Sequence, residues 1–271
     1  MKKLNLITCL LVFAIAFVVT VGAGYGEANA KSTIQKVLSK KELIIGTAPG
    51  YLPFEMLDKQ GNFMGYDVDL GKAIAESLGV SVEFKQFPFA GIIPALQTGE
   101  IDMVIAGMTI RGDRALAVSF SNPYYATGQV LMVPAHDNTT SSWQDLNVKG
   151  KRIAISQGTT GALLAKQIFK EPTLMDFEDF PSATLALVNG MADALIYDEP
   201  AIRMYETMQE DSVRGVYDLI SAENLGVAVA YGDFETVHWL NSFLYAYVNS
   251  PAEIESRDKW FHQTDWMELM N

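Results

Sequence analysis

Three parts of this chain could together bind a small molecule that carries both a carboxylate and an ammonium group. Arg114 offers a planar guanidinium whose N–H groups match the two oxygens of a carboxylate. The run GTTG (158–161) opens a predicted helix, and a helix N-terminus binds anions through its free N–H groups. Asp198 offers the opposite charge for an ammonium group. These residue types predict a zwitterion-binding site if the fold brings them together.

Further residues could complete such a site. The hydroxyl of Thr109 and the backbone N–H groups near Gly107 could donate hydrogen bonds to a carboxylate. Aromatic rings could sandwich an apolar or aromatic side chain, or face an ammonium group as cation–π partners. The full set of expected ligand-binding residues is Tyr51, Phe89, Gly107, Met108, Thr109, Arg114, Ser156, Thr159, Thr160, Tyr197 and Asp198.

Each of these residues also has an ordinary structural explanation. Taken alone, Arg114 could be a surface arginine of a helix, and the aromatic residues could belong to the core. Asp198 comes before Glu199 and Pro200, as a helix N-cap would. A shared binding site is favoured over these separate structural explanations, because the residues follow predicted strands. In open α/β sheets, ligands bind beyond the carboxyl ends of the strands.

The elements that must position these residues alternate between strands and helices. Short apolar runs predict strands at 42–48, 80–86, 101–107, 151–156, 172–177 and 192–197. Helical spacing predicts helices at 67–79, 90–100, 159–169 and 182–190, and a helical tail after about 233. This alternation predicts parallel sheets with helices on their faces.

An internal repeat relates the two halves of the chain. ALQTGEIDMVI starts at Ala95 and ALVNGMADALI starts at Ala186, an offset of 91 residues. Both stretches have the pattern A-L-x-x-G-x-x-D-x-[VL]-I at a predicted helix–turn–strand. The repeat favours two lobes of similar architecture over one large sheet. It also puts Gly107 and Asp198 at equivalent positions, so we expect them to face one cleft from opposite sides.

Two β-rich runs without turn signals are expected to connect the lobes. They lie at about 128–134 and 224–231. The predicted first lobe is therefore 41–128 plus 228–271, and the second is 134–224. Two parallel connections make a hinge, and a hinge between α/β lobes makes a cleft.

The first thirty residues have the pattern of a secretory signal peptide. Lys2 and Lys3 precede an apolar run, and Ala28 and Ala30 form an A-x-A site before Lys31. We expect cleavage after Ala30 and a periplasmic or otherwise extracytoplasmic protein. A retained membrane anchor is the alternative, since the apolar run is long enough to span a bilayer.

Charge and cysteine content exclude several classes of site. The formal charge is −12, and loss of two lysines and one glutamate with residues 1–30 makes it −13. Such a protein should not bind nucleic acid through phosphates. The only cysteine lies in the predicted signal, so the remaining chain should contain neither a disulfide nor a thiolate site. No metal-ligand spacing or phosphate loop occurs, and no cofactor is expected. Asp67 and Asp69 are interpreted as structural residues in a first helical turn.

The order of several motifs resembles the amino-acid-binding family of periplasmic solute receptors for ABC transporters. The motifs are GYDVDL, GIIPALQTGEIDMVIAGMTIRGDR, FSNPYY, GTTG and DALIYDEP, and the similarity covers nearly all of the chain after residue 30. The resemblance implies an α/β, two-lobe periplasmic-binding-protein-like (type II) fold joined by a two-strand hinge. It also implies delivery of an amino acid-like ligand to an ABC transporter permease in the inner membrane. We expect a monomer.

The resemblance also assigns roles to residues. In the family, a G-x-T-I-x-x-x-R segment binds the ligand α-carboxylate, a threonine of the second lobe also contacts it, an aspartate holds the α-ammonium, and two aromatic residues flank the mouth of the first lobe. The matching positions here are Gly107, Thr109 and Arg114, then Thr159 or Thr160, then Asp198, and finally Tyr51 with Phe89.

Two departures from the family pattern bear on the ligand. Many members have aspartate where this chain has Ala48, and glutamine receptors have lysine where this chain has Ser156. These departures make a basic amino acid or glutamine less expected. They favour a neutral, apolar or aromatic ligand side chain.

Three other functions remain as alternatives. Exported dehydratases such as cyclohexadienyl dehydratase resemble these receptors, and Glu55, Asp198 and Glu199 could supply an acid or base. The ligand-sensing lobe of a receptor kinase or ion channel is a further alternative. The RGD tripeptide at 111–113 suggests cell adhesion, but it follows a predicted buried strand rather than lying in a protruding loop.

Overall fold

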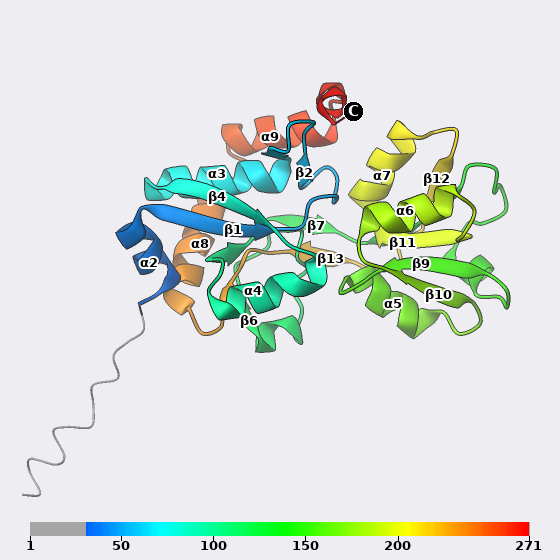
Figure 1. Ribbon diagram of the computed structural model, residues 1–271, viewed down its shortest axis with the longest axis horizontal. Helices are drawn as coiled ribbons and strands as arrows, with labels where there is room; N and C mark the ends of the chain where they lie inside the picture. Colours follow the sequence, from blue (N-terminus) through cyan, green and yellow to red (C-terminus); the bar gives the residue numbers. More distant parts are fainter. Residues whose placement is uncertain (1–30, 271) are drawn as a thin grey trace, which may run out of the picture. The chain divides into compact units, whose positions relative to one another are not determined.

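A computed structural model describes residues 31–270, which contain two five-stranded sheets flanked by helices (Figure 1). The predicted signal peptide, residues 1–30, lies outside the described residues. The first sheet has the order β4 (Ser81–Gln86), β1 (Glu42–Thr47), β5 (Met103–Val104), β14 (Ala228–Ala230), β6 (Val118–Phe120). The second has the order β10 (Thr173–Phe177), β9 (Arg152–Ser156), β11 (Ala194–Asp198), β8 (Gln129–Pro134), β12 (Val213–Val216).

The two sheets follow one plan, as a two-lobe type II fold requires. In each sheet the first three strands are parallel and the fourth is antiparallel to the third. In the first sheet, β1 pairs with β4 from Glu42↔Ser81 to Thr47↔Gln86 and with β5 at Ile45↔Met103. We call the parts built around the first and second sheets the first and second lobes.

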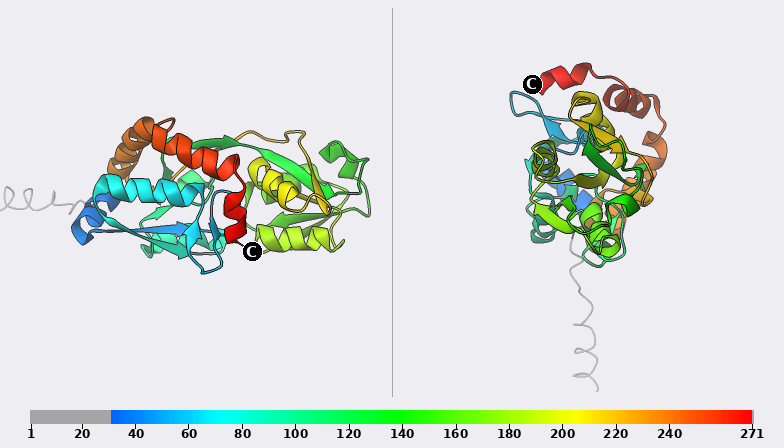
Figure 2. Two further views of the ribbon diagram at one scale, coloured as in Figure 1. Left: turned by 90° about the horizontal axis from the view of Figure 1, so that it is seen from above. Right: turned by 90° about the vertical axis from the view of Figure 1, so that its right-hand side faces the viewer.

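Helices cover both faces of each sheet (Figures 1 and 2). The helices of the first lobe are α2 (Thr33–Lys40), α3 (Tyr66–Leu78), α4 (Ile92–Thr98), α8 (Phe234–Tyr247) and α9 (Pro251–Phe261). The second lobe has α5 (Thr160–Ile168), α6 (Phe180–Val188) and α7 (Glu199–Met208). The short strands are β2 (Met56–Leu57) and β3 (Phe63–Met64). The 3-10 helices are η1 (Phe89–Gly91), η2 (Arg114–Leu116), η3 (Trp143–Leu146) and η4 (Asp265–Leu269). Within residues 31–270, no helix is both long and apolar enough to span a bilayer.

The repeated helix–turn–strand has the same structural role in both lobes. It forms the end of α4 and β5 in the first lobe, and the end of α6 and β11 in the second. The repeated aspartates, Asp102 and Asp193, each accept a hydrogen bond from the backbone N–H of the neighbouring strand. The donor is Ile44 at 2.7 Å in one lobe and Arg152 at 2.8 Å in the other. The repeat therefore preserves the contact that joins this turn to the neighbouring strand, β1 or β9.

A two-stranded antiparallel sheet connects the lobes. It pairs β7 (Tyr125–Thr127) with β13 (Glu223–Leu225). The run 128–134, predicted as a hinge strand, instead forms β8 inside the second sheet, where it pairs with β11 and β12. The apolar side chains of this run are buried on both faces, which a solvent-exposed hinge strand would not allow. We propose that the hinge lies at β7 and β13. The predicted lobe boundaries stay a prediction.

Asp69 joins α3 to α9, in keeping with its interpretation as a structural residue. Its Oδ2 accepts hydrogen bonds from the indole Nε1 of Trp260 at 2.6 Å and from the hydroxyl of Ser256 at 2.9 Å. The Trp260 side chain is buried, so removal of this acceptor leaves a buried donor without its partner.

We predict that Asp69→Ala lowers the free energy of unfolding by about 2–3 kcal/mol, because two hydrogen bonds to a charged group are lost. Chemical denaturation monitored by circular dichroism measures the change. Glu76→Ala, at an exposed position of the same helix, is the matched control and should cost less than about 0.5 kcal/mol. Equal losses for the two variants would contradict the prediction.

Candidate functional site

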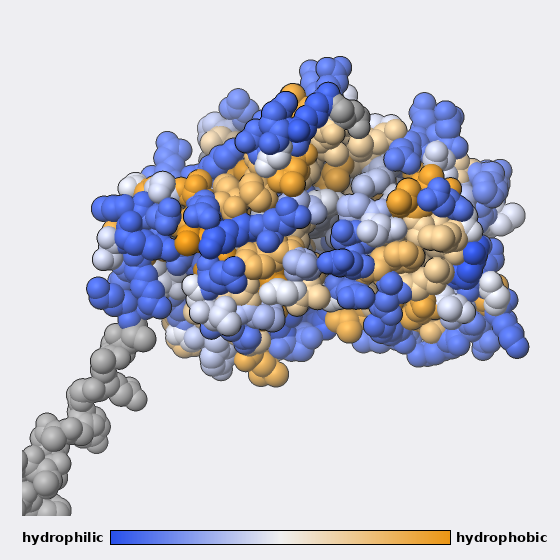
Figure 3. Space-filling model, in the orientation of Figure 1, coloured by the Kyte–Doolittle hydropathy of each residue, from blue (hydrophilic) through white to orange (hydrophobic). Residues whose placement is uncertain are grey.

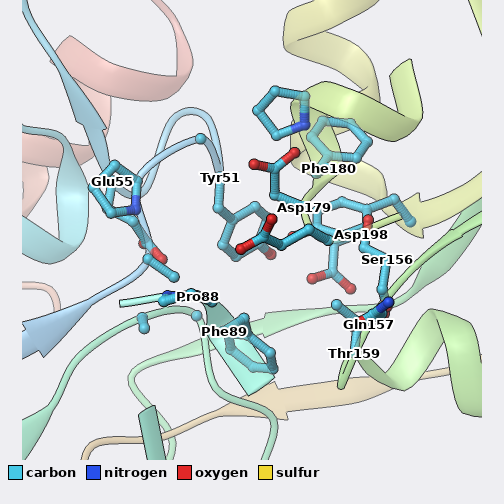
Figure 4. A pocket seen from close by; sticks show the side chains of 18 of the residues that line it. Tyr51, Glu55, Pro88, Phe89, Ser156, Gln157, Thr159, Asp179, Phe180 and Asp198 are labelled. Atoms are coloured by element: carbon cyan, nitrogen blue, oxygen red, sulfur yellow. The ribbon is translucent and has the colours of Figure 1, made fainter. Parts of the chain in front are cut away.

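A cavity of about 130 Å³ lies between the two lobes, at the ends of their strands. The face of the molecule in Figure 3 is hollowed there. The lining comes from the carboxyl ends of β1, β4 and β5 and the segments after them in the first lobe. In the second lobe it comes from the carboxyl ends of β9, β10 and β11, the segments after them, and Gln129 at the start of β8. In Figure 4, Tyr51, Pro88 and Phe89 face Ser156, Thr159 and Asp198 across the cavity.

Ten of the eleven expected ligand-binding residues line this cavity. They are Tyr51, Phe89, Gly107, Thr109, Arg114, Ser156, Thr159, Thr160, Tyr197 and Asp198. Met108 does not line it, because its side chain is fully buried in the first-lobe core near Ile92 and Val104. Gly107 has a φ of 54°, so the chain turns at this point and the Met108 side chain points into the core instead of the cavity.

Arg114 provides the positive charge of the site. It begins η2 and is 8% exposed, so it is not the surface arginine that its sequence context also allowed. Its Nη1 donates to the carbonyl oxygen of Thr109 at 3.0 Å, and its Nη2 donates to that of Gly158 at 2.9 Å. The guanidinium carbon lies 5.2 Å from the centre of the Phe89 ring. Burial lowers the pKa of Arg114 to about 10, which leaves it charged at neutral pH.

The neighbouring residues of the RGD tripeptide have a different environment. Arg111 pairs with Asp113 at 2.9 Å, and the Asp113 side chain is 62% exposed. This is a surface ion pair within one turn. Among the described residues that line the cavity, Arg114 is the only arginine or lysine.

Asp198 provides a buried negative charge from the second lobe. It ends β11 and precedes α7, but its side chain makes no capping hydrogen bond to that helix. Its carboxylate accepts a hydrogen bond from Nε2 of Gln129. Burial, followed by the charge of Glu223, raises the pKa of Asp198 to about 7, against the opposing effect of Arg114. The helix position is therefore that of an N-cap, while the carboxylate is available to the cavity.

Gln129 was missed by the sequence reasoning. It is the first residue of β8 and is directly opposite Asp198 in the β8–β11 pairing. Its amide approaches Gly161 so closely that a Cβ at that glycine would lie 2.6 Å from the Gln129 oxygen. The glycine of the GTTG run thus makes room for Gln129, a tertiary contact for which the sequence has no local signal.

The two threonines of the GTTG run have different roles. Thr159 is the N-cap of α5: its Oγ1 accepts from the N–H of Ala162 at 3.1 Å and donates to the carbonyl of Ser156 at 2.8 Å. Thr160 instead donates its hydroxyl hydrogen to Glu223 at 2.7 Å. Thr159 is therefore committed to the helix start, and Thr160 is the threonine whose hydroxyl belongs to the polar network of the site.

Aromatic rings form the apolar walls of the cavity. Tyr197 stacks on Phe180 with ring centres 4.0 Å apart, and Tyr51 meets Tyr197 edge-on at 5.4 Å. Tyr51 also covers Gly107, where an added Cβ would lie 2.0 Å from its ring. Gly107 has a φ of 54°, so both its conformation and this contact favour glycine.

The connection after β10 and the first two residues of α6 also line the cavity. These residues are Glu178, Asp179, Phe180 and Pro181, and none of them was expected. They follow the predicted strand 172–177 directly. Because ligands bind beyond the carboxyl ends of strands in open α/β sheets, their position after this strand is a sequence signal for a place in the site.

Two buried acids belong to the first-lobe side of the cavity: Glu55 lines it, and Asp67 is hydrogen-bonded to Gly107 of the lining. Asp67 accepts hydrogen bonds from the N–H of Gly107 at 2.7 Å and the hydroxyl of Tyr124 at 2.8 Å. Burial raises the pKa of Asp67 to about 6, and burial together with the Asp67 charge raises the pKa of Glu55 well above its usual value. Burial therefore favours the neutral form of Glu55. The Gly107 N–H, expected as a donor to the ligand, is already occupied by Asp67.

Some polar atoms of the lining have no partner within the described residues. The Ser156 hydroxyl and the Gln129 amide oxygen are buried without a hydrogen bond. The carboxyl group of Glu55 is also buried, and its one polar contact is with Asp67. A polar ligand would satisfy such groups. In the described part of the chain, no cluster of histidine, cysteine, aspartate or glutamate could hold a metal ion.

Comparison with known proteins gives a consistent family. The model of the bacterial extracellular solute-binding proteins, family 3, matches residues 43–263. A probable histidine-binding protein of Neisseria gonorrhoeae is 34% identical over 201 residues, which are 72% of this chain and 73% of the relative.

Two solved structures share both fold and sequence with this chain. One is an ancestral amino acid-binding protein described as a precursor of cyclohexadienyl dehydratase. It is 38% identical, with a TM-score of 0.80, and the match covers 85% of this chain and 100% of that one. The other is a binding component of an ABC transporter from Wolinella succinogenes in complex with lysine. It is 34% identical, with a TM-score of 0.81, and covers 84% and 99% of the two chains.

Proposed function

Because this chain belongs to the bacterial extracellular solute-binding proteins of family 3, we propose that it is an amino-acid receptor of an ABC transporter. The observation that supports this proposal most is the presence of Arg114 and Asp198 in one interlobe cavity. Arg114 would bind the α-carboxylate of the ligand, and Asp198 its α-ammonium. Hinge closure about β7 and β13 would bury both pairs and so strengthen them.

The ligand side chain would contact the aromatic walls. Tyr51, Phe89, Phe180 and Tyr197 offer ring faces and edges, which support the neutral or aromatic side chain expected from the sequence. We propose this class as the first candidate.

A positively charged side chain is the second candidate, because the lining is acidic. One arginine faces four carboxyl groups, those of Glu55, Glu178, Asp179 and Asp198, a formal balance of −3. Burial raises the pKa of Glu55, which favours its neutral form, and Asp198 would be matched by the ligand ammonium. Glu178 and Asp179 then remain near the mouth, where both are exposed. The histidine-binding name of one relative and the lysine bound in one neighbour support this second class.

A thermal-shift panel tests the proposal and separates the two classes. It would compare phenylalanine, tyrosine, leucine, histidine, lysine and arginine, with tyramine and histamine as analogues that lack the carboxylate. A ligand at 100 times its dissociation constant adds about 2.7 kcal/mol to the stability of the folded state. Shifts with phenylalanine or tyrosine favour the first class, and shifts with lysine or arginine favour the second. If no amino acid of the panel raised the melting temperature, or if the amines raised it equally, amino-acid recognition through Arg114 would be refuted.

An enzyme on the same fold is a separate candidate function. The specific observation in its favour is that burial raises the pKa values of two carboxyl groups of the cavity, Glu55 and Asp198. The pKa of Asp198 is raised to about 7, so this group could act as an acid near neutral pH. Incubation with prephenate or arogenate, followed by chromatography, tests it. Turnover that is lost in Asp198→Asn would favour the enzyme over the receptor.

The family description also bears on location and partners. Members are bacterial extracellular proteins, which agrees with the secretion expected from residues 1–30. We propose that the protein acts outside the cytoplasm as a monomer, after cleavage following Ala30. Its partner would be the permease of an ABC transporter in the inner membrane.

A further inference from the structure

Glu223 lies in the connection between the lobes and contacts both of them. It is the first residue of β13, which pairs with β7. Its Oε2 accepts a hydrogen bond from the hydroxyl of Thr109 in the first lobe at 2.7 Å. The same oxygen accepts one from the hydroxyl of Thr160 in the second lobe, also at 2.7 Å. One carboxylate oxygen thus joins residues of both lobes.

The remaining contacts hold this carboxylate in place. The other oxygen of Glu223 accepts from the hydroxyl of Ser221 at 2.9 Å. Thr160 also accepts a hydrogen bond from Nε2 of Gln129 at 3.2 Å, and the same Nε2 donates to Asp198. A continuous chain of hydrogen bonds therefore runs from Asp198 through Gln129 and Thr160 to Glu223, and from there to Thr109.

A threonine hydroxyl has a single hydrogen to donate. Since Thr109 and Thr160 both donate to Glu223, neither hydroxyl can at the same time donate to a ligand carboxylate. In this arrangement Glu223 takes the place that a ligand carboxylate would have on the two threonines. Hydrogen bonds to an ionised acceptor are about twice as strong as neutral ones, so this arrangement resists disruption.

Thr109, Thr160 and Glu223 also separate the ligand cavity from a second hollow. Thr109 and Thr160 line both cavities, and the second one is open, has a volume of about 340 Å³, and is lined as well by Arg111, Leu163 and Glu223. The three side chains form the wall between the two spaces, so their hydrogen bonds close the hinge side of the ligand cavity.

We propose that Glu223 is a positioning residue that ties the two lobes together in the ligand-free protein, through the hydroxyls of Thr109 and Thr160. The lobes must separate to admit a ligand, and separation breaks at least one of the two hydrogen bonds. Together with the hydrogen bond from Arg114 to the Gly158 carbonyl, Glu223 therefore influences the population of the open form and the rate at which ligand enters. The effect on entry rests on the proposed receptor function, whereas the tie between the lobes does not.

Small-angle X-ray scattering of the ligand-free protein, refolded to remove any bound molecule, tests the tie. Glu223→Gln keeps the side-chain shape and removes the charge. Thr160→Val removes the hydroxyl, whereas Thr160→Ser retains it. We expect a larger radius of gyration for Glu223→Gln and Thr160→Val than for the wild type. Thr160→Ser and the exposed Asp218→Asn, which removes a charge from the same connecting segment, should match the wild type.

A wild-type radius of gyration for Glu223→Gln, or equal values for Thr160→Val and Thr160→Ser, would overturn the proposal. If Glu223→Gln did not fold, the comparison of the radii of gyration of Thr160→Val and Thr160→Ser would still test the proposal. Stopped-flow measurement with an amino acid from the panel is the second readout. The association rate constant should rise several-fold in Glu223→Gln and stay unchanged in Asp218→Asn. If no amino acid binds, the receptor function fails while the scattering result still decides on the tie.

Discussion

Replacement of Arg114 by alanine is expected to weaken amino-acid binding by about 3–5 kcal/mol, which corresponds to a dissociation constant roughly two to three and a half orders of magnitude higher. The reason is that the ligand carboxylate would be buried without a cation. Arg114 is the only arginine or lysine among the described residues of the lining, so no neighbour can replace its charge. Isothermal titration calorimetry measures the loss.

Two controls separate the charge of Arg114 from its geometry and from folding. Arg114→Lys retains the charge but loses the planar pair of donors, so its affinity should lie between those of the wild type and Arg114→Ala. Arg111→Ala removes a nearby arginine whose partner, Asp113, is exposed, and should change the dissociation constant less than about twofold. Unchanged binding in Arg114→Ala, with an intact circular dichroism spectrum, would show that Arg114 does not bind the ligand.

Ligand affinity is expected to fall as pH falls below about 7, because Asp198 must be ionised to bind an ammonium group. Burial raises the pKa of Asp198 to about 7 in the ligand-free protein, and a bound ammonium would lower it again. A group whose pKa is lowered by the ligand favours binding above the pKa of the free protein. Binding is lost as pH falls through that value. Between pH 7.5 and pH 5 the dissociation constant should rise by up to about 100-fold.

This dependence is best measured with a ligand whose side chain does not titrate, such as phenylalanine or leucine if the panel selects one. In Asp198→Asn the affinity should be weak and nearly independent of pH over the same range. A wild-type profile that is flat from pH 5 to 7.5 would contradict the assignment of Asp198 to the ammonium group.

The stability of the ligand-free protein should have the opposite dependence on pH. The pKa values of Asp198 and Asp67 are raised in the folded state, to about 7 and about 6, above the value of about 3.9 for an unfolded aspartate. Between these limits the folded state binds more protons than the unfolded state. These two groups therefore make the free energy of unfolding decrease as pH rises from 4 to 7. We expect the ligand affinity to rise with pH while the free energy of unfolding of the ligand-free protein falls. Observation of both changes would indicate that buried carboxyl groups cause them.

Much of the fold follows from local sequence patterns. The predicted strands at 42–48, 80–86 and 151–156 and the predicted helix at 67–79 are confirmed within one or two residues, because each has a clear hydrophobic period and ends at a glycine or a turn. The run at 128–134 has the same β-rich composition as a connecting strand. Its place in the second sheet depends on pairing with β11 and β12, which local composition does not specify.

The residue types of the site were also accessible from the sequence. Arg114 and Asp198 follow strands, and the 91-residue repeat places Gly107 and Asp198 at equivalent points of the two lobes. Met108 was included wrongly among the lining residues, because the alternation of side chains around Gly107 depends on the turn that the chain makes there.

The sequence by itself determined the class of fold and the family motifs, and it predicted Arg114 and Asp198 as ligand-binding residues, because these inferences depend on residue types and on spacing along the chain. Only the tertiary structure decided how the polar groups are paired: Gly107 with Asp67, Gln129 with Asp198, and Thr109 and Thr160 with Glu223. A hydrogen bond requires its two atoms to lie about 3 Å apart with suitable direction. The partners here are separated by 40 to 114 residues, and their approach depends on how the whole chain packs.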